Sequence, residues 1–350
     1  MAHYFNIMLG RGLGGIERAF INCAEALLAR GHRVTCVASP KAAVIDELGK
    51  IKHPNLQIEL LRNFAVWDCF AIQRLSNRIT KLNPDAILTH GTRAATFARR
   101  AAKHVPVAAF AHNYSIRRLL GAEVIFAISK HLKETIEAAD ATQNVVMIPN
   151  MIRMTNTEVA QKPFQNPPVI GSMGRFVQKK GFADLLDALA LLKKNNISFK
   201  AMIAGDGEES AALKEKAEKL GLSALVSFPG WIKNPDDFYN QIDFFVLPSL
   251  HEPFGIVLLE AFAKALGVVS TDTEGPSEIV TRGKNALVVE RGNVQALADA
   301  MKTLLYDPAY AHNLGKAGLE TVKTEYDMNS VGRRIETELQ QLVLANTKAA

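Results

Sequence analysis

The sequence has no run of eighteen or more apolar residues, so we expect no transmembrane helix. The first nine residues carry neither a basic run nor a long apolar stretch, which argues against a secretory signal peptide. Cysteine is scarce, because only Cys23, Cys36 and Cys69 occur, and none are in CxxC spacing. We interpret them as buried, reduced thiols, which together with the missing signal peptide indicates a cytoplasmic protein.

Two common nucleotide-binding signatures are also missing. A glycine-rich loop, Gly10–Glu17, follows the first expected strand, and such a loop can approach a ligand closely. A nicotinamide dinucleotide site needs an acidic residue at the end of the second strand, but Val37–Pro40 contains none. The sequence also lacks the Gly-Lys-Ser/Thr of a P-loop. Hydride transfer and P-loop chemistry are therefore the weaker interpretations.

Charge is unevenly distributed over the 350 residues. Residues 1–150 contain 19 Lys+Arg and 11 Asp+Glu, a balance of +8, and the remainder contains 22 and 24, a balance of −2. This asymmetry favours an anionic partner for the first half, such as a membrane surface or a phosphorylated acceptor; a solvated basic surface without a partner remains the alternative. Nucleic acid is disfavoured, because no recognisable module interleaves basic and aromatic residues.

Short β-branched runs alternate with longer amphipathic stretches, which is typical of βαβ units and a parallel sheet. The pattern predicts two domains of class α/β. The expected strands of the first are Tyr4–Leu9, Arg33–Ala38, Ala86–Thr89, Val105–Phe110, Val124–Ile128 and Val145–Ile148. Its expected helices are Ile16–Ala29, Trp67–Leu82, Arg93–Lys103 and Lys130–Ala139.

The alternation stops at Pro149-Asn150 and restarts at Val169. We therefore expect a first domain over 1–150, a linker over 151–168, a second domain over 169–328, and a terminal helix over 329–350 that packs back on the first domain. The expected strands of the second domain are Val169–Met173, Phe199–Ile203, Val226–Phe228, Phe244–Leu247 and Val268–Ser270. Its helices, with the last one of the chain, are Gly181–Lys193, Ala211–Lys219, Gly255–Ala265, Val294–Tyr306, Ala309–Glu325 and Ser330–Ala345.

Candidate ligand-binding residues follow the expected strands, where open parallel sheets bind ligands. Arg175 follows the first strand of the second domain, and Lys180 lies five residues later at a helix start, an arrangement suited to a diphosphate. Glu252 follows the strand Phe244–Leu247, and Glu260 lies within the apolar helix that comes next. A carboxylate there needs a partner, and the vicinal hydroxyls of a ribose can supply one.

Two histidines end strands of the first domain. His112 lies in Phe110–Tyr114, where its imidazole can donate a hydrogen bond to a sugar hydroxyl, and a structural role is the alternative. His90 lies at the end of the preceding strand and has the weaker case.

Together these residues resemble the retaining glycosyltransferases of family 4, which have the GT-B fold of two Rossmann-like parallel-sheet domains. The resemblance covers nearly the whole chain and is densest in the second domain. The two glutamates of its most specific motif have seven residues between them. The matching elements are Gly14-Gly15 with Glu17; His112; Pro149-Asn150; Gly174-Arg175-Phe176 with Lys180-Gly181; Gly205-Asp206-Gly207; Phe228-Pro229-Gly230; and Pro248-Ser249 with Glu252, Phe254-Gly255 and Glu260.

The resemblance implies a function for each group of residues. The second domain would bind a nucleoside-diphosphate sugar, with Arg175 and Lys180 on the diphosphate and Glu260 on the ribose. Glu252 and the amides near Phe254 and Gly255 would hold the transferred sugar, and His112 would contact it. The catalytic set is then His112, Arg175, Lys180 and Glu252. The donor-binding set is Gly14, Gly15, Gly174, Arg175, Lys180, Gly205, Glu252, Phe254, Gly255, Ile256 and Glu260.

No metal or cofactor is expected, since the family needs none and the sequence has no clear Asp-x-Asp motif at a strand end. The basic first domain would bind a glycan or lipid-linked acceptor of bacterial surface polysaccharide or lipopolysaccharide, with Arg11, Arg93 and Arg117 as the acceptor residues. Arg93, Arg99, Arg100 and Lys103 fall on one face of an expected helix, which suggests a peripheral contact with an anionic membrane.

This sequence departs from the family pattern in two places. Gly267–Ser270 lacks the usual proline, and Glu274–Ile279 lacks one of two glycines before Glu-Ile, which leaves the donor contacts of that loop open. The alternatives are a non-catalytic binding protein of the same fold, a Rossmann oxidoreductase, and an epimerase or phosphorylase with twin domains. The intact set of Arg175, Lys180, Glu252 and Glu260 favours the enzyme.

Overall fold

The computed structural model describes residues 1–349 except 13, 66, 155–158, 161 and 233, so the expected linker lies partly outside the described residues. The chain divides into two compact units. The first contains Met1–Arg153 and Asp327–Ala350, and the second contains Met154–Tyr326.

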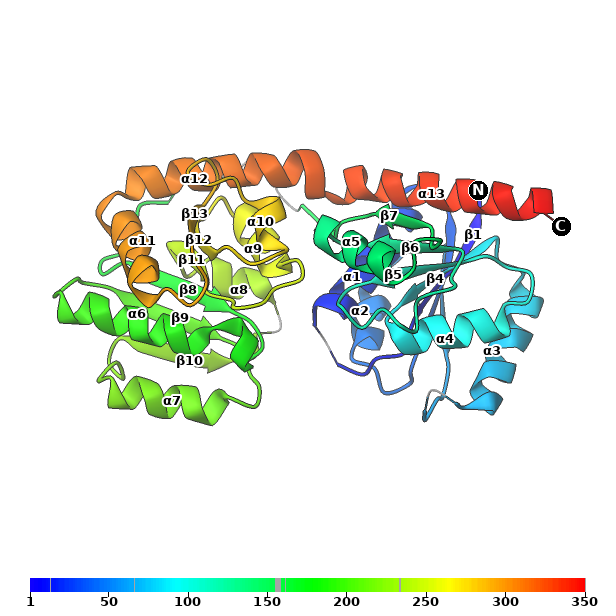
Figure 1. Cartoon of the computed structure of the whole chain (residues 1–350), viewed down its shortest axis with the longest axis horizontal. Helices are drawn as coiled ribbons and strands as arrows, with labels where there is room; N and C mark the ends of the chain where they lie inside the picture. The colour runs from blue at the N-terminus through cyan, green and yellow to red at the C-terminus, as the bar shows by residue number, and fades with distance from the viewer. Residues whose placement is uncertain (13, 66, 155–158, 161, 233, 350) are drawn as a thin grey trace. The chain divides into compact units, whose positions relative to one another are not determined.

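The first unit is a seven-stranded parallel sheet in the order β3-β2-β1-β4-β5-β6-β7 (Figure 1). Its strands are β1 (His3–Met8), β2 (Arg33–Ala38), β3 (Leu56–Leu60), β4 (Ala86–His90), β5 (Val107–Ala111), β6 (Val124–Ala127) and β7 (Val145–Met147). Its helices are α1 (Gly15–Ala29), α2 (Val44–Lys50), α3 (Cys69–Leu82), α4 (Thr92–Ala101), α5 (Lys130–Ala139) and α13 (Met328–Ala349).

Both faces of this sheet are buried, which explains the apolar strands. Along β1, Phe5 and Ile7 pack into the core under α3 and α4, while the Asn6 amide donates to the carbonyl of Phe20 in α1 on the other face. Helix α13 packs along α1, where Gly332 approaches Ala26 closely. Glu336 of α13 forms ion pairs with Arg30 and His32, so the end of the chain is fastened to the first unit.

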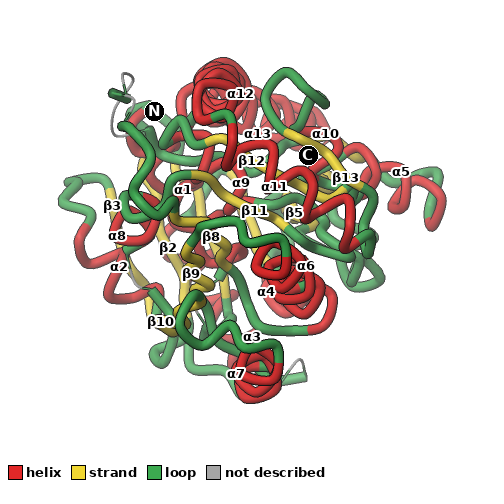
Figure 2. The backbone as a smooth tube through the Cα atoms, turned by 90° about the vertical axis from the view of Figure 1, so that its left-hand side faces the viewer, coloured by secondary structure: helices red, strands yellow, loops and turns green. Residues whose placement is uncertain are grey.

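The second unit is a six-stranded parallel sheet in the order β10-β9-β8-β11-β12-β13, with helices packed against it (Figure 2). Its strands are β8 (Val169–Met173), β9 (Lys200–Ala204), β10 (Val226–Gly230), β11 (Phe244–Leu247), β12 (Gly267–Thr271) and β13 (Leu287–Val289). Its helices are α6 (Phe182–Lys194), α7 (Ser210–Lys219), α8 (Pro235–Tyr239), α9 (Ile256–Ala263), α10 (Pro276–Ile279), α11 (Val294–Tyr306) and α12 (Pro308–Thr321), with the single turns η1 (Gln178–Lys180) and η2 (Val322–Tyr326).

The strand order reverses once in each sheet, between β1 and β4 and between β8 and β11. Loops that follow the two strands at such a reversal diverge to opposite faces and leave a crevice at the carboxyl edge. The glycine-rich loop after β1 and His90 at the end of β4 flank the first reversal. The Gly174-Arg175 loop after β8 and the Pro248–Gly255 loop after β11 flank the second. These loops carry most of the candidate residues.

The expected α/β class is confirmed, and most expected elements lie within a few residues of the observed ones. The sequence missed β3 and β13, which are edge strands, as well as the short helices α2, α8 and α10. β3 alternates the apolar Leu56, Ile58 and Leu60 with Gln57 and Glu59 instead of forming the apolar run of a central strand.

The helix expected from Trp67 begins at Cys69, because the Asp68 carboxylate caps it by accepting a hydrogen bond from the Ala71 amide. Trp67 therefore stays outside the helix. The expectation that all three cysteines are buried is wrong for Cys69, which is exposed at this helix start. Cys23 and Cys36 are buried, and burial raises the pKa of the Cys36 thiol to about 12.

Glycine is required at the point where the loop after β9 passes close to the loop after β8. Gly205 has a φ of 147°, and a Cβ at this position would lie 1.9 Å from the carbonyl oxygen of Gly174. We expect Gly205→Ala to lower the free energy of unfolding by about 3 kcal/mol or more, because backbone strain adds to steric overlap. The matched control is Gly283→Ala, whose φ is 73° but whose Cβ would meet nothing within 4 Å. It should lose only the strain, about 1 kcal/mol. Equal losses in urea unfolding would contradict the argument.

Candidate functional site

An ion pair lies at the strand-order reversal of the second unit. The Lys180 ammonium donates to the Glu252 carboxylate, joining η1 to the loop after β11. The two side chains are 21% and 9% exposed, so both charges are largely withdrawn from water. Such a pair stays favourable only with tight geometry, and removing either partner leaves an uncompensated charge. The structure thus brings together two residues that the sequence placed 72 positions apart.

The backbone holds these two loops against each other. The amides of Leu250 and His251 donate to the Lys179 carbonyl at 2.9 and 3.1 Å. Gly181, with a φ of 67°, lies where a Cβ would be 1.9 Å from the carbonyl oxygen of Pro248. Any larger residue would push the loops apart. The position of Lys180 relative to Glu252 is therefore fixed by the main chain as well as by the ion pair.

Arg175 lies on the same side of this reversal, in the loop after β8. Its side chain is exposed, and its guanidinium makes no hydrogen bond or ion pair with any described residue. The loop itself is ordered, because the Gly174 amide donates to Ala204 and the Phe176 amide donates to Asp206. Gly205 supports the close approach of this loop to β9 and contributes no side chain of its own. Arg175 is thus a positioned cation open to an anionic ligand.

Helix α9 begins beside Glu252 without a side-chain cap. Gly255 has a φ of 98° and precedes the first helical residue, Ile256, while Phe254 is 5% exposed and packs against Tyr326. Gly275 lies so close that its Cβ would be 2.3 Å from the Phe254 amide nitrogen. The amides at this helix start can donate to sugar or phosphate oxygens.

Glu260 is half-buried in α9 and has a partner that the sequence did not reveal. The Tyr239 hydroxyl lies 3.1 Å from its carboxylate and 3.0 Å from the Val257 carbonyl. Burial and then the charge of Glu260 raise the pKa of Tyr239 well above its ordinary value, so the phenol remains a donor. Tyr239 orients Glu260. Its role could not be read from the sequence, because Tyr239 ends the short helix α8, which no periodicity marked.

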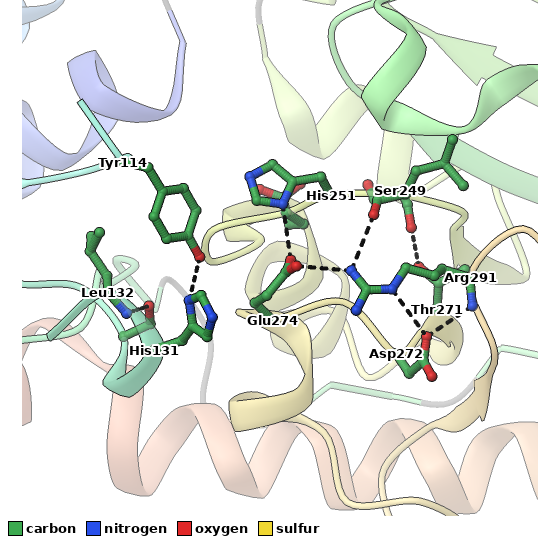
Figure 3. A network of polar contacts seen from close by, with 12 residues as sticks. Tyr114, His131, Leu132, Ser249, His251, Thr271, Asp272, Glu274 and Arg291 are labelled. Atoms are coloured by element: carbon green, nitrogen blue, oxygen red, sulfur yellow. Dashed lines mark hydrogen bonds and ion pairs between the residues drawn. The ribbon is translucent and has the colours of Figure 1, made fainter. Parts of the chain in front are cut away.

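A charged cluster joins the loops after β11, β12 and β13 (Figure 3). Glu274 accepts from Arg291 at 2.8 Å and lies 3.1 Å from His251 Nδ1, and the Arg291 amide donates to Asp272 at 2.8 Å. Partial burial raises the pKa of Glu274, but the hydrogen bond from Arg291 and the nearby charges outweigh it and leave that pKa lowered. The loop that departs from the family pattern is thus fixed by ion pairs, and no motif pointed to Arg291.

In the first unit, His112 is half-buried at the end of β5 and pairs with His90. Nε2 of His112 lies 2.9 Å from Nδ1 of His90, and both rings stack on Phe110. Burial lowers the pKa of His112 to about 4 and that of His90 well below its ordinary value, so both rings are neutral near pH 7. One ring must then donate to the other. His90 Nε2 is buried without a partner among the described residues.

The neutral pair restricts what His112 can offer a ligand. If His90 donates, His112 keeps a proton on Nδ1, and the buried Nε2 of His90 is a bare acceptor. If His112 donates, the buried Nε2 of His90 carries an N–H without a partner. An orphaned N–H group is the rarer situation in proteins. The first tautomer is thus favoured, and it makes the outer nitrogen of His112 a hydrogen-bond donor.

A pocket of about 480 Å³ lies at the strand-order reversal of the first unit. Arg11, Arg93 and Glu17 line it together with Gly10 and His90. Two of the three expected acceptor residues are therefore brought together. Gly14 precedes α1 in extended conformation and Gly15 begins it, and no side chain caps this helix start.

The third expected acceptor residue, Arg117, lines a different pocket of about 510 Å³ with Arg99, Arg100 and Arg118. The expected single face of Arg93, Arg99, Arg100 and Lys103 is wrong. The reason is that α4 ends at Ala101, before Lys103, and that Arg93 donates to Asn63 and lines the first pocket instead.

Two negative findings hold for the part of the chain that the structure describes. No group of three or more His, Cys, Asp or Glu side chains there is arranged to hold a metal ion. No helix there has the length and apolar character that crossing a membrane requires.

Comparisons with known proteins match most of the chain. A family model described as "Glycosyltransferase Family 4" matches residues 13–155, and one described as "Glycosyl transferases group 1" matches residues 154–321. The lipopolysaccharide core biosynthesis glycosyltransferase LpsD of Rhizobium meliloti (strain 1021) is 28% identical over 327 residues, covering 91% of this chain and 92% of LpsD. LpsE of the same organism is 28% identical over 328 residues, covering 91% and 93%.

Solved structures share the fold at lower identity. A glycosyltransferase from Rickettsia africae ESF-5 has a TM-score of 0.84 and 20% identity, covering 98% of each chain. Anabaena Alr3699/HepE in complex with UDP-glucose has a TM-score of 0.83 and 20% identity, covering 97% of this chain and all of that one. These likenesses confirm the expected GT-B fold of two Rossmann-like domains.

The histidine pair makes stability depend on pH. The unfolded chain binds protons on these side chains below about pH 6.5, whereas the folded chain does so only near the lowered pKa, about 4 for His112. The free energy of unfolding therefore keeps its full value above pH 6.5, as far as this pair is concerned, and falls as the pH drops toward 4. At pH 5 we expect His112 alone to lower the free energy of unfolding by about 2 kcal/mol, because the unfolded chain binds a proton there and the folded chain does not. A His90→Phe/His112→Asn variant should lose less stability than wild type between about pH 7.5 and about pH 5 in urea unfolding. Identical losses would show that the pair is not the cause.

Proposed function

Because the chain belongs to the family 4, group 1 glycosyltransferases, we propose that it is a retaining enzyme that transfers a sugar from a nucleoside-diphosphate sugar to a lipid-linked or glycan acceptor. The observation that carries the proposal is the Lys180–Glu252 pair at the strand-order reversal, with Arg175 open beside it and an uncapped helix start adjacent. Cations and amides for a diphosphate are thus held next to a carboxylate that can accept from sugar hydroxyls.

Different residues of the second unit bind the diphosphate, the ribose and the transferred sugar of the donor. Arg175 and Lys180 bind the diphosphate, whose charge grows as the bond to the sugar breaks. Glu260, oriented by Tyr239, accepts from the ribose hydroxyls. Glu252 and the amides of Phe254, Gly255 and Ile256 hold the transferred sugar. We assign to the outer nitrogen of His112 a hydrogen bond to that sugar, which the favoured tautomer allows.

The reaction retains the anomeric configuration. The acceptor hydroxyl attacks from the face that the diphosphate leaves, its oxygen bonds to the anomeric carbon, and the carbon–oxygen bond to the diphosphate breaks. The proton of the acceptor hydroxyl passes to a diphosphate oxygen. No side chain forms a covalent bond to the sugar, so what the protein supplies is positioning and charge stabilisation.

The acceptor proposal rests on charge and on the relatives. Arg11 and Arg93 in one pocket suit an anionic acceptor group, and two relatives are named lipopolysaccharide core biosynthesis glycosyltransferases. A panel of nucleotide sugars with lipopolysaccharide-type acceptors, followed by NMR of the product's anomeric proton, tests donor, acceptor and stereochemistry together. An inverted product would overturn the retaining mechanism.

We expect Arg175→Ala and Lys180→Ala each to lower turnover roughly a hundred- to a thousandfold, because each removes a cation that stabilises the leaving diphosphate. Arg175 has no partner in the described structure to lose, so its variant should melt like wild type. The matched control is Lys179→Ala, since the exposed Lys179 supplies the loop only with its backbone carbonyl. Turnover is measured by steady-state kinetics. Wild-type turnover in both variants would show that the diphosphate is held elsewhere.

We also propose that the enzyme needs no metal ion, since Arg175, Lys180 and the start of α9 supply positive charge and amide donors for the diphosphate. Activity should survive exhaustive treatment with EDTA and should not rise when magnesium or manganese is added back. Loss of activity on chelation that either metal restores would refute this.

A further inference from the structure

Large apolar side chains project into solvent from one short segment of the first unit. Phe64, Trp67 and Phe70 are 84%, 69% and 80% exposed, and Leu60 beside them is 45% exposed. The described residues contain nine large apolar side chains with this degree of exposure, and four of the nine lie between positions 60 and 70. Single exposed apolar residues are ordinary, but a group of them marks an interaction surface.

Hydrogen bonds fix several of the described residues in and around this segment. The Asp68 carboxylate accepts from the amides of Phe64 and Ala71 at 3.2 and 2.9 Å. Arg74 donates to the carbonyl of Arg62 at 2.8 Å. The backbone is fastened on both sides of the aromatic residues while their rings remain outside the core.

Arginines lie close to the exposed Trp67 and Phe64. Trp67 lines the 510 Å³ pocket together with Arg99, Arg100, Arg117 and Arg118, and Phe64 lines the 480 Å³ pocket together with Arg11 and Arg93. The four arginines of the larger pocket are exposed and make no hydrogen bond or ion pair with another residue in the described ranges. The one acidic residue in that pocket, Glu123, has a carboxylate oxygen that accepts from the Val107 amide.

We propose that the exposed side chains of Leu60, Phe64, Trp67 and Phe70, with the arginines of the larger pocket, dock the first unit on an anionic lipid bilayer. Phe64, Trp67 and Phe70 enter the interfacial layer, where aromatic rings are favoured, and Arg99, Arg100 and Arg118 contact lipid phosphates. The inference rests on the proposed function only for its purpose, which is to keep the enzyme at the surface that carries a lipid-linked acceptor.

Charge complementarity selects the bilayer over other occupants. A second copy packed face to face would bring the same unpaired arginines against each other, because a two-fold interface uses the same patch on both partners. An anionic bilayer instead offers phosphates to the guanidinium groups and an apolar layer to the rings at the same time. A protein partner would need both acidic groups for the arginines and a groove for the rings.

Binding is measured by co-sedimentation with phosphatidylcholine vesicles and with vesicles that also contain phosphatidylglycerol, across a salt series. Insertion is read from Trp67. The chain has two tryptophans, so Trp231→Phe leaves Trp67 as the only tryptophan, which is excited selectively at wavelengths that tyrosine does not absorb. We expect binding to the anionic vesicles alone, weakened by salt. We also expect a blue shift of Trp67 emission, with quenching by brominated lipid.

Two variants separate the contributions. Phe64→Ala/Trp67→Ala/Phe70→Ala should weaken vesicle binding about tenfold or more, because it removes the apolar area that enters the bilayer. Arg99→Gln/Arg100→Gln/Arg118→Gln should weaken it about a hundredfold, since each basic residue near an anionic surface raises affinity about fivefold. Matched controls in the second unit are Trp231→Ala, an exposed aromatic, and Lys194→Gln/Lys284→Gln/Lys316→Gln, three exposed cations. Both controls should bind like wild type.

Four results would overturn the proposal: no binding to anionic vesicles at low salt, an aromatic variant that binds like wild type, Trp67 emission of the Trp231→Phe protein that brominated lipid does not quench, or dimerisation in the ultracentrifuge that the aromatic variant abolishes. Hydrolysis of the nucleotide sugar without vesicles is measured in parallel and should be unchanged in both docking variants. A protein that binds vesicles but never turns over a nucleotide sugar would refute the proposed function and leave the docking surface intact.

Discussion

The second unit depends on one constraint, the contact between the loop after β8 and the loop after β11. Lys180 and Glu252 are charged groups that water would otherwise solvate, and they are held together where the strand order reverses. Their contact needs Gly181, since a Cβ there would overlap the carbonyl oxygen of Pro248. The ion pair therefore depends on the glycine: Gly181 lets the two loops approach each other, and this approach brings Lys180 and Glu252 together.

This arrangement has a consequence for binding. A buried ion pair contributes little net stability, because the cost of removing both charges from water offsets their attraction. The Lys180–Glu252 pair is therefore better understood as a preorganised site than as a stabilising contact. In the proposed function, an arriving diphosphate would take the lysine as its counter-ion, and hydroxyl groups of the sugar would take the carboxylate. Neither group has to be brought from water to meet the ligand, and this is the advantage of a preorganised polar site.

Sequence reasoning succeeded for the fold, because central strands are continuous apolar runs and these predict the α/β class. It also named candidate residues: Arg175, Lys180 and Glu252 come after strands, and Glu260 lies in the helix α9 that follows β11. Features that only tertiary packing creates could not be predicted. Tyr239 reaches Glu260 from a helix of five residues, and Arg291 reaches Glu274 from the turn after an edge strand of three residues. Neither element is long enough for periodicity to reveal it.

The exposure of Trp67 and Phe70 is a second feature that the sequence pattern could not predict. The sequence predicted a helix over Trp67–Leu82. The helix begins two positions later because Asp68 caps it, and that shift leaves Trp67 outside the helix. Phe70 lies within the helix and is exposed, while Ala71, Leu75 and Ile79 are its buried residues. The beginning of a helix is the part of it that periodicity defines least well, so the sequence did not show that Trp67 lies outside it. The net charge of the first 150 residues points to an anionic partner, but only the position of the rings among unpaired arginines distinguishes a bilayer from a soluble anion.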